Sequence, residues 1–284
     1  MTVRLAAAQL PACGDDLDAN CLAAEMAVRA AAAAGAAIVA LPELATVPYF
    51  CGGRPEDYRG WAESADGPLA TRFAALAREC SVTLFFPFYE RDRATGRFHN
   101  SVLGFDADGR QLRDGPVARK LHLPVGDDPP PGFDEPAHFA AGESLHVVEA
   151  AGLKIGVLVC YDRRFPEAWR ALRAKGAELV IVPVAGSGGD DMNFFIGEMR
   201  THARENGLAV LCANKVGDEH VGGGVVDNYG HSTIIDADGA VLALRPATEG
   251  SGLAVANIDQ TLIAATRRSL RYYEHRREDL YGRL

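Results

Sequence analysis

One cysteine stands where an apolar strand is expected to meet a helix, in the stretch GVLVCYDRRFPEAW (residues 156–169). The thiolate is the nucleophilic form of cysteine, so a reactive cysteine needs a base or a positive field beside it. Cys160 would meet the dipole and free N–H groups of the following helix, and Arg163 and Arg164 add two positive charges. The stretch therefore indicates a nucleophilic thiol. The alternative is a small core residue that ends a strand.

Two further polar residues come directly after apolar strands. Glu43 follows the strand in AIVALPELATVPYF, and Lys120 ends the strand in GPVARKLHLPVG. Taken singly, Glu43 could be a surface or helix-start carboxylate, and Lys120 could be a solvated lysine. Taken together with Cys160, they form a usable catalytic set of base, cation and nucleophile.

The elements that must position these residues alternate along the chain. Short apolar strands recur between helical patterns in both halves, and hairpins separate them, which indicates a mixed α/β architecture with more than one layer of sheet. No linker rich in Ser, Pro or Gly divides the sequence, so residues 1–284 are expected to form one domain. The helices are expected at 17–34, 67–79, 166–175 and 192–205, and DADG turns at 106–109 and 236–239 predict two hairpins. The proline-rich stretch Val125–Ala141 is expected to be a functional or mobile loop.

The bulk composition narrows the possible partners and compartment. The net charge is −9 and no block of like charges occurs, so no nucleic-acid or anionic-membrane surface is expected. The basic stretch RRSLRYYEHRRED near the C-terminus is interpreted as a solvated or subunit-contacting tail. We find no transmembrane span, signal-peptide pattern or CxxC pair, so a reducing cytoplasm fits best.

The ordered set of segments resembles the nitrilase (carbon–nitrogen hydrolase) superfamily, whose triad is Glu, Lys and Cys. LPEL supplies Glu43, RKLHLP supplies Lys120 and GVLVCYDRRFPE supplies Cys160, in the order of that family. NSVLGFDADG, KGAELVIVPVA, ARENGLAVLCANKVG and GHSTIIDADGAVLA also look like family segments, so the resemblance covers essentially the whole chain. The family has a second active-site glutamate, for which PGFDEPAHF offers Glu135, with Asp134 as the competing candidate.

The resemblance implies a four-layer α-β-β-α sandwich, a homo-oligomer such as a dimer or tetramer, and chemistry without a metal or cofactor. Glu43 would act as general base while Cys160 attacks the carbonyl carbon of a small amide or ureido substrate. Lys120 and a backbone N–H, expected to be that of Tyr161, would stabilise the oxyanion. Glu135 would orient Lys120 or the substrate nitrogen.

The arginine pair bears on the substrate. Arg163 or Arg164 could bind a substrate carboxylate in bidentate geometry, or both could pair with Asp162, Glu167 or Glu198. The DRRFPE stretch resembles N-carbamoyl-D-amino-acid amidohydrolases, although Tyr161 stands where that subgroup usually has asparagine and Phe133 where it has histidine.

Other activities stay open at this point. The segment CYDRRFPE is equally similar to the ω-amidase and Nit-type branch, while RKLHLP resembles N-carbamoylputrescine amidases, whose cationic substrate suits an arginine pair poorly. Nitrile hydrolysis and a non-enzymatic binding protein are the remaining alternatives. We expect Tyr49, Phe50, the 125–141 loop and AGSGGDD (185–191) to set specificity. His122 could line the pocket or hydrogen-bond from behind it.

Overall fold

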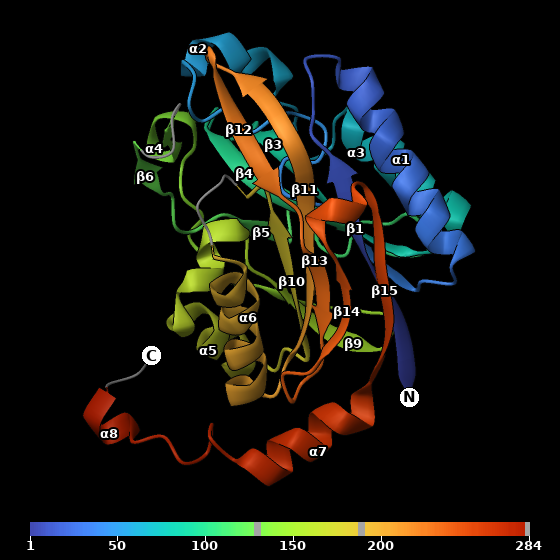
Figure 1. The fold of residues 1–284 in the computed structure, drawn as a ribbon, viewed down its shortest axis with the longest axis vertical. Coiled ribbons are helices and arrows are strands. Elements are labelled where there is room, and N and C mark those ends of the chain that lie inside the picture. The colour runs from blue at the N-terminus through green and yellow to red at the C-terminus, as the bar shows by residue number, and fades with distance from the viewer. Residues whose placement is uncertain (128–131, 187–190, 282–284) are drawn as a thin grey trace.

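The computed structural model describes residues 1–127, 132–186 and 191–281, and all of its strands except one short two-stranded pair lie in two large sheets that meet at one edge contact (Figure 1). The first has the order β5-β4-β3-β2-β1-β15 and the second β8-β9-β10-β11-β13-β14. Strands β1 and β11 pair in parallel at Leu10–Lys215 and join the two sheets. The strands of the first sheet are β1 (Thr2–Pro11), β2 (Ile38–Ala40), β3 (Thr83–Arg91), β4 (Phe98–Phe105), β5 (Ala118–Arg119) and β15 (Gly252–Asp259). Those of the second are β8 (Val147–Ala150), β9 (Leu153–Val157), β10 (Leu179–Val184), β11 (Ala209–Val221), β13 (Ser232–Ile235) and β14 (Val241–Arg245).

Helices cover the outer face of each sheet. In Figure 1, α1 (Leu17–Ala33) and α3 (Pro68–Cys80) lie on one side, and α5 (Pro166–Ala174) and α6 (Met192–Asn206) lie on the other. Successive β1 residues serve different layers, because Leu5 packs between the sheets while Ala6 packs toward α1 and α3. A third cluster joins the second sheet to α5 and α6. The fold is therefore a four-layer α-β-β-α sandwich, as the resemblance implied.

The carboxyl ends of the strands that precede the candidate residues meet at one end of the molecule. Strands β1, β2 and β3 are parallel, and so are β9, β10 and β11. Strand β5 is antiparallel to β4, which is antiparallel to β3, so β5 runs with β1 to β3. The parallel pairing of β1 with β11 gives both sheets the same direction. The carboxyl ends of β2, β5 and β9 therefore lie at the same end of the molecule. Ligands of α/β sheets commonly bind at such carboxyl ends.

Most of the predicted elements are confirmed. Each expected helix lies within about two residues of its predicted bounds, and the later DADG turn joins β13 to β14 in a hairpin. The earlier hairpin prediction was wrong in part, since the return strand makes one bridge, Phe105–Gln111, before β5 begins at Ala118. The segment Gly115-Pro116 lies between them, and proline cannot donate to a strand ladder.

Several elements were not predicted. These are α2 (Pro55–Tyr58), η1 (Arg59–Trp61), β6 (Val125–Gly126), β7 (Phe133–Asp134), α4 (Glu135–His138), η2 (Cys160–Arg164), β12 (Gly224–Tyr229), η3 (Ala247–Glu249), β15, α7 (Gln260–Leu270) and α8 (Glu278–Tyr281). The basic stretch is not wholly solvated, because Arg267 of α7 donates to the carbonyls of Gly207 and Ala177. Helix α7 therefore packs under α6 (Figure 1).

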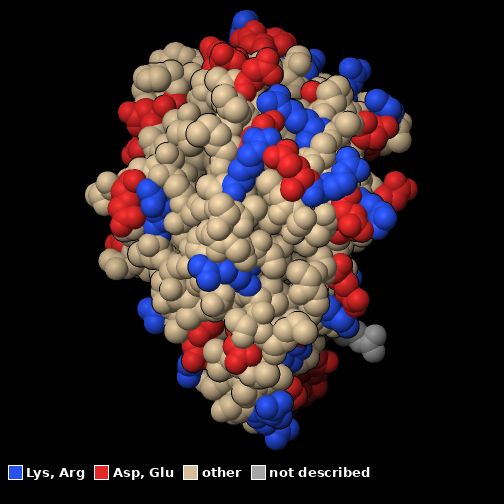
Figure 2. All heavy atoms as spheres, turned by 90° about the vertical axis from the view of Figure 1, so that its right-hand side faces the viewer, with Lys and Arg blue, Asp and Glu red and all other residues tan. Residues whose placement is uncertain are grey.

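Charges of both signs are interspersed over the face shown in Figure 2. Arg29 pairs with Glu25 and Glu79, linking α1 to α3, and Arg72 of α3 also reaches Glu25. Exposed pairs of this kind contribute little to stability but keep the surface charge mixed. Within the described ranges we find no helix long and apolar enough to cross a membrane.

Candidate active site

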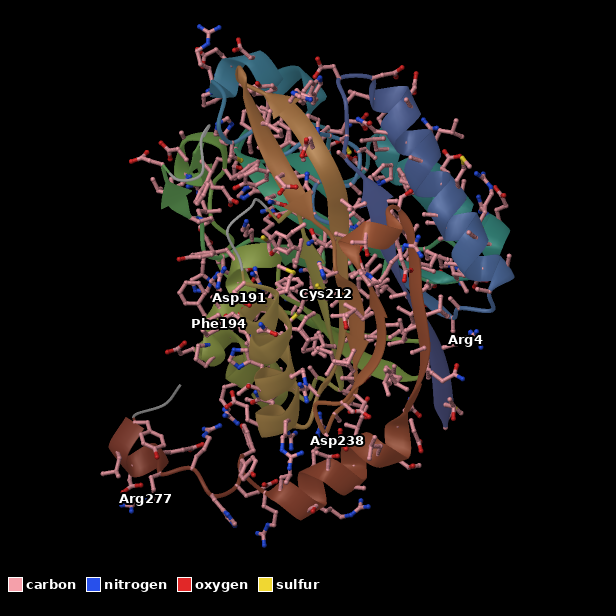
Figure 3. All side chains as sticks on the ribbon, viewed as in Figure 1. Arg4, Asp191, Phe194, Cys212, Asp238 and Arg277 are labelled. Atoms are coloured by element: carbon pink, nitrogen blue, oxygen red, sulfur yellow. The ribbon has the colours of Figure 1, made fainter. Side chains whose placement is uncertain are left out.

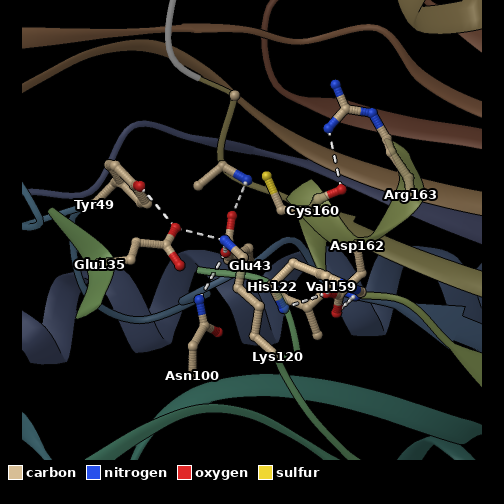
Figure 4. A network of polar contacts seen from close by, with 12 residues as sticks. Glu43, Tyr49, Asn100, Lys120, His122, Glu135, Val159, Cys160, Asp162 and Arg163 are labelled. Carbon is tan, nitrogen blue, oxygen red and sulfur yellow. Dashed lines mark hydrogen bonds and ion pairs between the residues drawn. The ribbon is translucent and has the colours of Figure 1, made fainter. Parts of the chain in front are cut away.

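Glu43 is held at the end of β2 by donors from three other parts of the chain. Its side chain has no exposed surface. Oε1 accepts from Asn100 Nδ2 at 2.7 Å and from Lys120 Nζ at 2.9 Å, and Oε2 accepts from the Ala185 backbone N–H at 2.8 Å (Figure 4). The next residue, Leu44, has φ 47°, a left-handed conformation that L-residues adopt at a cost. The turn after β2 is thus shaped to keep this carboxylate inside the site.

Lys120 is a fully buried cation between two carboxylates. Its Nζ lies 2.9 Å from Glu43 Oε1 and 2.5 Å from Glu135 Oε1. Burial alone would lower the pKa of Lys120, but the Glu135 and Glu43 carboxylates raise it well above its usual value. The ammonium therefore stays charged, and the alternative of a solvated lysine is wrong.

Glu135, rather than Asp134, enters the site. Asp134 is exposed and accepts from the Ala137 N–H at the start of α4, whereas Glu135 is buried on the first turn. Glu135 Oε1 accepts from both Lys120 and the Tyr49 hydroxyl, the latter at 2.8 Å. Oε2 is also buried, and among the described residues it has no hydrogen-bond partner. Burial raises the pKa of Glu135 to about 7, although the Lys120 ammonium opposes the rise.

Cys160 occupies the predicted corner between β9 and the helices η2 and α5. Its φ is 47°, so the thiol sits on a strained left-handed turn. Figure 4 shows its sulfur pointing into the space beside Glu43 and Lys120. Burial, and then the Glu43 charge, raise the pKa of the Cys160 thiol despite the opposing charges of Lys120 and Arg163. The positive field expected from the sequence is present, but desolvation outweighs it, so the resting thiol is protonated.

Asp162 connects the turn that bears Cys160 to the loop that bears Lys120. Its carboxylate accepts from the backbone N–H groups of Val159, Leu121 and His122, the last at 2.8 Å. It also lies 2.8 Å from the His122 Nδ1, while the His122 ring stacks on Phe165 at a centroid distance of 3.6 Å. His122 therefore hydrogen-bonds from behind the site, which was one of the two alternatives for it.

The two arginines after Cys160 differ in burial. Arg163 is 2% exposed, donates to the Cys160 carbonyl at 3.1 Å and lies over the Phe195 ring. Its Nε is 3.3 Å from Glu198 Oε2. The Arg164 side chain is 38% exposed, with Nη1 4.0 Å from Glu198 Oε1. Pairing with Glu198 was one of the anticipated alternatives, and it is present in both cases.

The aromatic residues expected to set specificity also differ from one another. The Phe50 side chain has no exposure and packs in an aromatic cluster with Tyr58 and Tyr89, so the expectation that it shapes the pocket was wrong. Tyr49 is buried and directs its hydroxyl at Glu135. Tyr161 is half-buried, with its ring edge-on to Phe165. Residues 128–131 and 187–190 of the two expected specificity loops lie outside the described residues.

Sequence reasoning missed Asn100 and Asp162 as parts of the site. Asn100 lies in β4, inside a segment singled out for its resemblance, and Asp162 was considered only as an arginine partner. Both side chains are buried and hydrogen-bonded in the structure, as buried polar groups usually are, but no local signal in the sequence marks them. Among the described residues, no group of three or more His, Cys, Asp or Glu side chains is arranged to hold a metal ion.

Comparisons with known proteins agree with this geometry. The chain is 34% identical over 282 residues to N-carbamoylputrescine amidase of Arabidopsis thaliana, covering 95% of this chain and 91% of that protein. It is 30% identical to a citrullinase of Francisella tularensis subsp. tularensis, covering 99% and 98%.

Solved structures are similarly close. A carbon–nitrogen hydrolase from Helicobacter pylori G27 superposes with a TM-score of 0.88 at 28% identity, covering 99% of this chain and 98% of that one. An amidase from Nesterenkonia sp. AN1, with acrylamide added at its active site cysteine, has a TM-score of 0.79 at 26% identity and covers 98% of each chain. The sequence also matches the carbon–nitrogen hydrolase family over residues 4–268. The chain therefore belongs to the carbon–nitrogen hydrolase family.

Proposed function

We propose that this protein hydrolyses the terminal C–N bond of a small N-carbamoyl or amide compound through a covalent intermediate on Cys160. One observation carries the proposal: the fully buried Glu43–Lys120–Glu135 cluster lies beside a thiol held on a strained turn. A buried cluster with strongly shifted pKa values at the end of a sheet is typical of a catalytic site. The nature of the relatives supports the same reaction class.

The first step needs a base because the Cys160 thiol is protonated at rest. Glu43 takes that proton as the sulfur attacks the carbonyl carbon, and a C–S bond forms. Three fixed donors hold the Glu43 carboxylate, so it need not reorient during the transfer. The proton then passes from Glu43 to the leaving nitrogen, and the C–N bond breaks to release ammonia.

The oxyanion of the tetrahedral intermediate would be stabilised by the Lys120 ammonium and the backbone N–H of Tyr161. Tyr161 is in the first turn of η2, where N–H groups have no acceptor within the helix. Glu43 next removes a proton from a water molecule, which attacks the thioester-type intermediate and frees Cys160. With an N-carbamoyl substrate the product is a carbamate, which breaks down to an amine and carbon dioxide. These steps use only side chains, the backbone and water.

Glu135 would bind the substrate's terminal nitrogen. Its Oε1 is occupied by Lys120 and Tyr49, whereas Oε2 is buried without a partner in the described structure. A buried acceptor without a partner is costly unless a ligand supplies a donor. An unsubstituted amide or ureido NH₂ supplies such a donor, and the names of two relatives, N-carbamoylputrescine amidase and citrullinase, describe ureido compounds.

The distal part of the substrate, beyond its amide or ureido group, would bind near Arg164. Arg163 is already engaged with Glu198, Phe195 and the Cys160 carbonyl, which favours a structural role for it. Arg164, whose side chain is 38% exposed, is the guanidinium that a substrate carboxylate would reach. The competing possibility is a cationic distal group, as in N-carbamoylputrescine, and it is favoured by the name of the Arabidopsis relative.

We also propose that residues 1–284 act as one catalytic domain of a cytoplasmic homo-oligomer. All six cysteines are free thiols, which suits a reducing compartment. Large apolar side chains exposed on β14, among them Leu242 and Leu244, are suited to a subunit contact. Light scattering of the purified protein would test the oligomer.

The decisive experiment measures ammonia release from a panel of small C–N compounds. The panel holds N-carbamoyl amino acids of both hands, N-carbamoylputrescine, ω-amides, aliphatic amides and nitriles. We expect turnover of N-carbamoyl or primary amide compounds, and Cys160→Ala should abolish it. A wild-type protein that binds panel members without turnover would instead be a binding protein.

A further inference from the structure

A second fully buried ion pair lies near the site but takes no part in the proposed chemistry. Lys215 and Glu219 of β11 are 2.9 Å apart, and neither side chain has exposed surface. Lys215 Nζ also donates to the Val47 carbonyl at 2.7 Å. Glu219 accepts from the Tyr49 N–H at 2.7 Å and from the Cys13 N–H at 2.9 Å. The pair thus holds the backbone of the segment 47–49 from both ends.

The same segment delivers a hydroxyl to the second active-site carboxylate. Tyr49 Oη donates to Glu135 Oε1 at 2.8 Å, on the oxygen that also receives Lys120 Nζ (Figure 4). Two donors on Oε1 fix the rotation of the Glu135 carboxylate. Oε2 is thereby left as the acceptor that no described residue uses.

Two buried ions are an inefficient way to stabilise a fold, because well-packed apolar side chains of similar volume often do as well or better. Ions do, however, form short and directional hydrogen bonds. Here the ion pair bonds three backbone groups: the Val47 carbonyl and the N–H groups of Tyr49 and Cys13. Two of these groups lie in the segment 47–49 that carries the Tyr49 side chain. The pair is therefore suited to fixing geometry.

We propose that Lys215 and Glu219 are positioning residues that act through Tyr49 to hold Glu135 with Oε2 available to the substrate nitrogen. This inference rests on the proposed function of Glu135. It assigns Tyr49 to positioning rather than to the substrate contact expected from the sequence.

The charged and titratable groups around Glu135 give the inference a pH readout. The Lys120 ammonium and the Tyr49 hydroxyl favour the ionised carboxylate, whereas Glu43 opposes it. Cys51 and Cys160 also face it, and both are neutral thiols because burial raises their pKa values. Removing the Tyr49 hydroxyl should therefore raise the pKa of Glu135.

Tyr49→Phe tests the first link with the smallest change. We expect kcat to fall about tenfold and the acid limb of kcat/KM against pH to move up by about one unit, the equivalent of one charge-assisted hydrogen bond. Tyr89→Phe is the matched control. It also removes a hydroxyl from a buried tyrosine of the hydrophobic cluster that contains Tyr49, and within the described residues that hydroxyl makes no hydrogen bond. The acid limb of kcat/KM against pH should be the same in Tyr89→Phe as in the wild-type protein.

The ion pair is tested by combining Lys215→Met with Glu219→Gln, which removes both charges and leaves neither ion unpaired. This double variant should move the acid limb in the same direction as Tyr49→Phe. It should cause no further movement when added to Tyr49→Phe, because the contact through which it acts is gone. Melting temperatures of all variants report folding separately.

The outcomes separate this inference from the proposed function. Turnover retained by Cys160→Ala, or absent from wild type, would overturn the function and the inference with it. Wild-type turnover that Cys160→Ala abolishes, together with an unmoved limb in Tyr49→Phe, would overturn the positioning of Glu135 alone. The role of Lys215 and Glu219 would be overturned if the double variant left the acid limb in place. It would also be overturned if the double substitution moved the acid limb by the same amount in the wild-type and the Tyr49→Phe backgrounds. A fall in melting temperature with an unchanged limb would give them a structural role only.

Discussion

Glu43 and Lys120 form an ion pair 2.9 Å long in which neither side chain has any exposed surface. Removing one partner of a buried pair leaves an uncompensated charge and typically costs about 3–5 kcal/mol of stability. Because Lys120 also bonds Glu135, its loss would leave two carboxylates without their shared cation. The residues proposed to perform catalysis therefore also contribute to the integrity of the site.

Lys120→Ala should lower both activity and stability. We expect kcat to fall at least about a hundredfold, because an oxyanion donor is lost, and the melting temperature to fall as well. Activity must be measured well below the variant's melting temperature, on protein shown to be folded by circular dichroism. A change confined to KM would make Lys120 a substrate-binding residue.

The Cys160 thiol should depend on Glu43 for its reactivity. Iodoacetamide should inactivate the wild-type protein by alkylating Cys160, and substrate should protect it. Since burial raises the pKa of this thiol, Glu43→Gln should lower kcat by about a hundredfold or more and also slow alkylation. Peptide mass spectrometry would follow the modification.

Cys80 supplies the control for this labelling. It is half-buried, whereas Cys13, Cys21, Cys51 and Cys212 are buried. Figure 3 shows Cys212 on the central strand β11. Cys80→Ser should keep full activity and still be inactivated by iodoacetamide. Near-normal turnover by Cys160→Ser, or equal alkylation rates with and without Glu43, would contradict the mechanism.

Ionisation of Glu135 should set the acid limb of the pH profile. Its pKa is raised to about 7, so below that pH the carboxyl is protonated and no longer a full acceptor for the substrate N–H. We therefore expect kcat/KM to rise with pH through about 7 and to lose this limb in Glu135→Gln. Asp134→Asn is the matched control, because asparagine also caps helices and Asp134 is exposed. If Glu135→Gln kept the acid limb of kcat/KM unchanged, another group would be responsible for that limb.

The three strand-end residues could be predicted from the sequence because each follows an apolar run. Parallel strands in a layered α/β fold bring their carboxyl ends together, so the placement of Glu43, Lys120 and Cys160 needed only strand direction. The resemblance then supplied Glu135, which contacts Lys120 in the structure, whereas Asp134 is exposed. Residue type and local pattern were sufficient at these positions.

The contacts that hold those residues could not be predicted in the same way. Asn100 meets Glu43 across 57 positions, and Tyr49 meets Glu219 across 170. Nothing local in the sequence distinguishes a polar residue buried by such contacts from one on the surface. Desolvation at Cys160 is also a tertiary property, which is why the neighbouring cations suggested a lower thiol pKa than burial allows.

Arg163 and Arg164 should respond differently to substitution, and the difference identifies the distal group of the substrate. Arg163→Ala should destabilise the protein by roughly 2–3 kcal/mol, because it removes a buried guanidinium that lies 3.3 Å from the Glu198 carboxylate. It should lower turnover of all substrates to a similar extent, since its Nη1 supports the Cys160 carbonyl.

If Arg164 binds a substrate carboxylate, N-carbamoyl amino acids should be preferred over their neutral esters by about thirtyfold or more in kcat/KM, which corresponds to about 2 kcal/mol. Arg164→Ala should erase most of that preference while leaving turnover of the neutral esters nearly unchanged. Arg164→Lys should restore only part of it, because an ammonium cannot make a bidentate pair with a carboxylate. A preference for N-carbamoylputrescine over the acids, insensitive to Arg164, would assign a cationic distal group instead. In that case Arg163 and Arg164 would both have a structural role, pairing with Glu198 and stabilising the turn that carries Cys160.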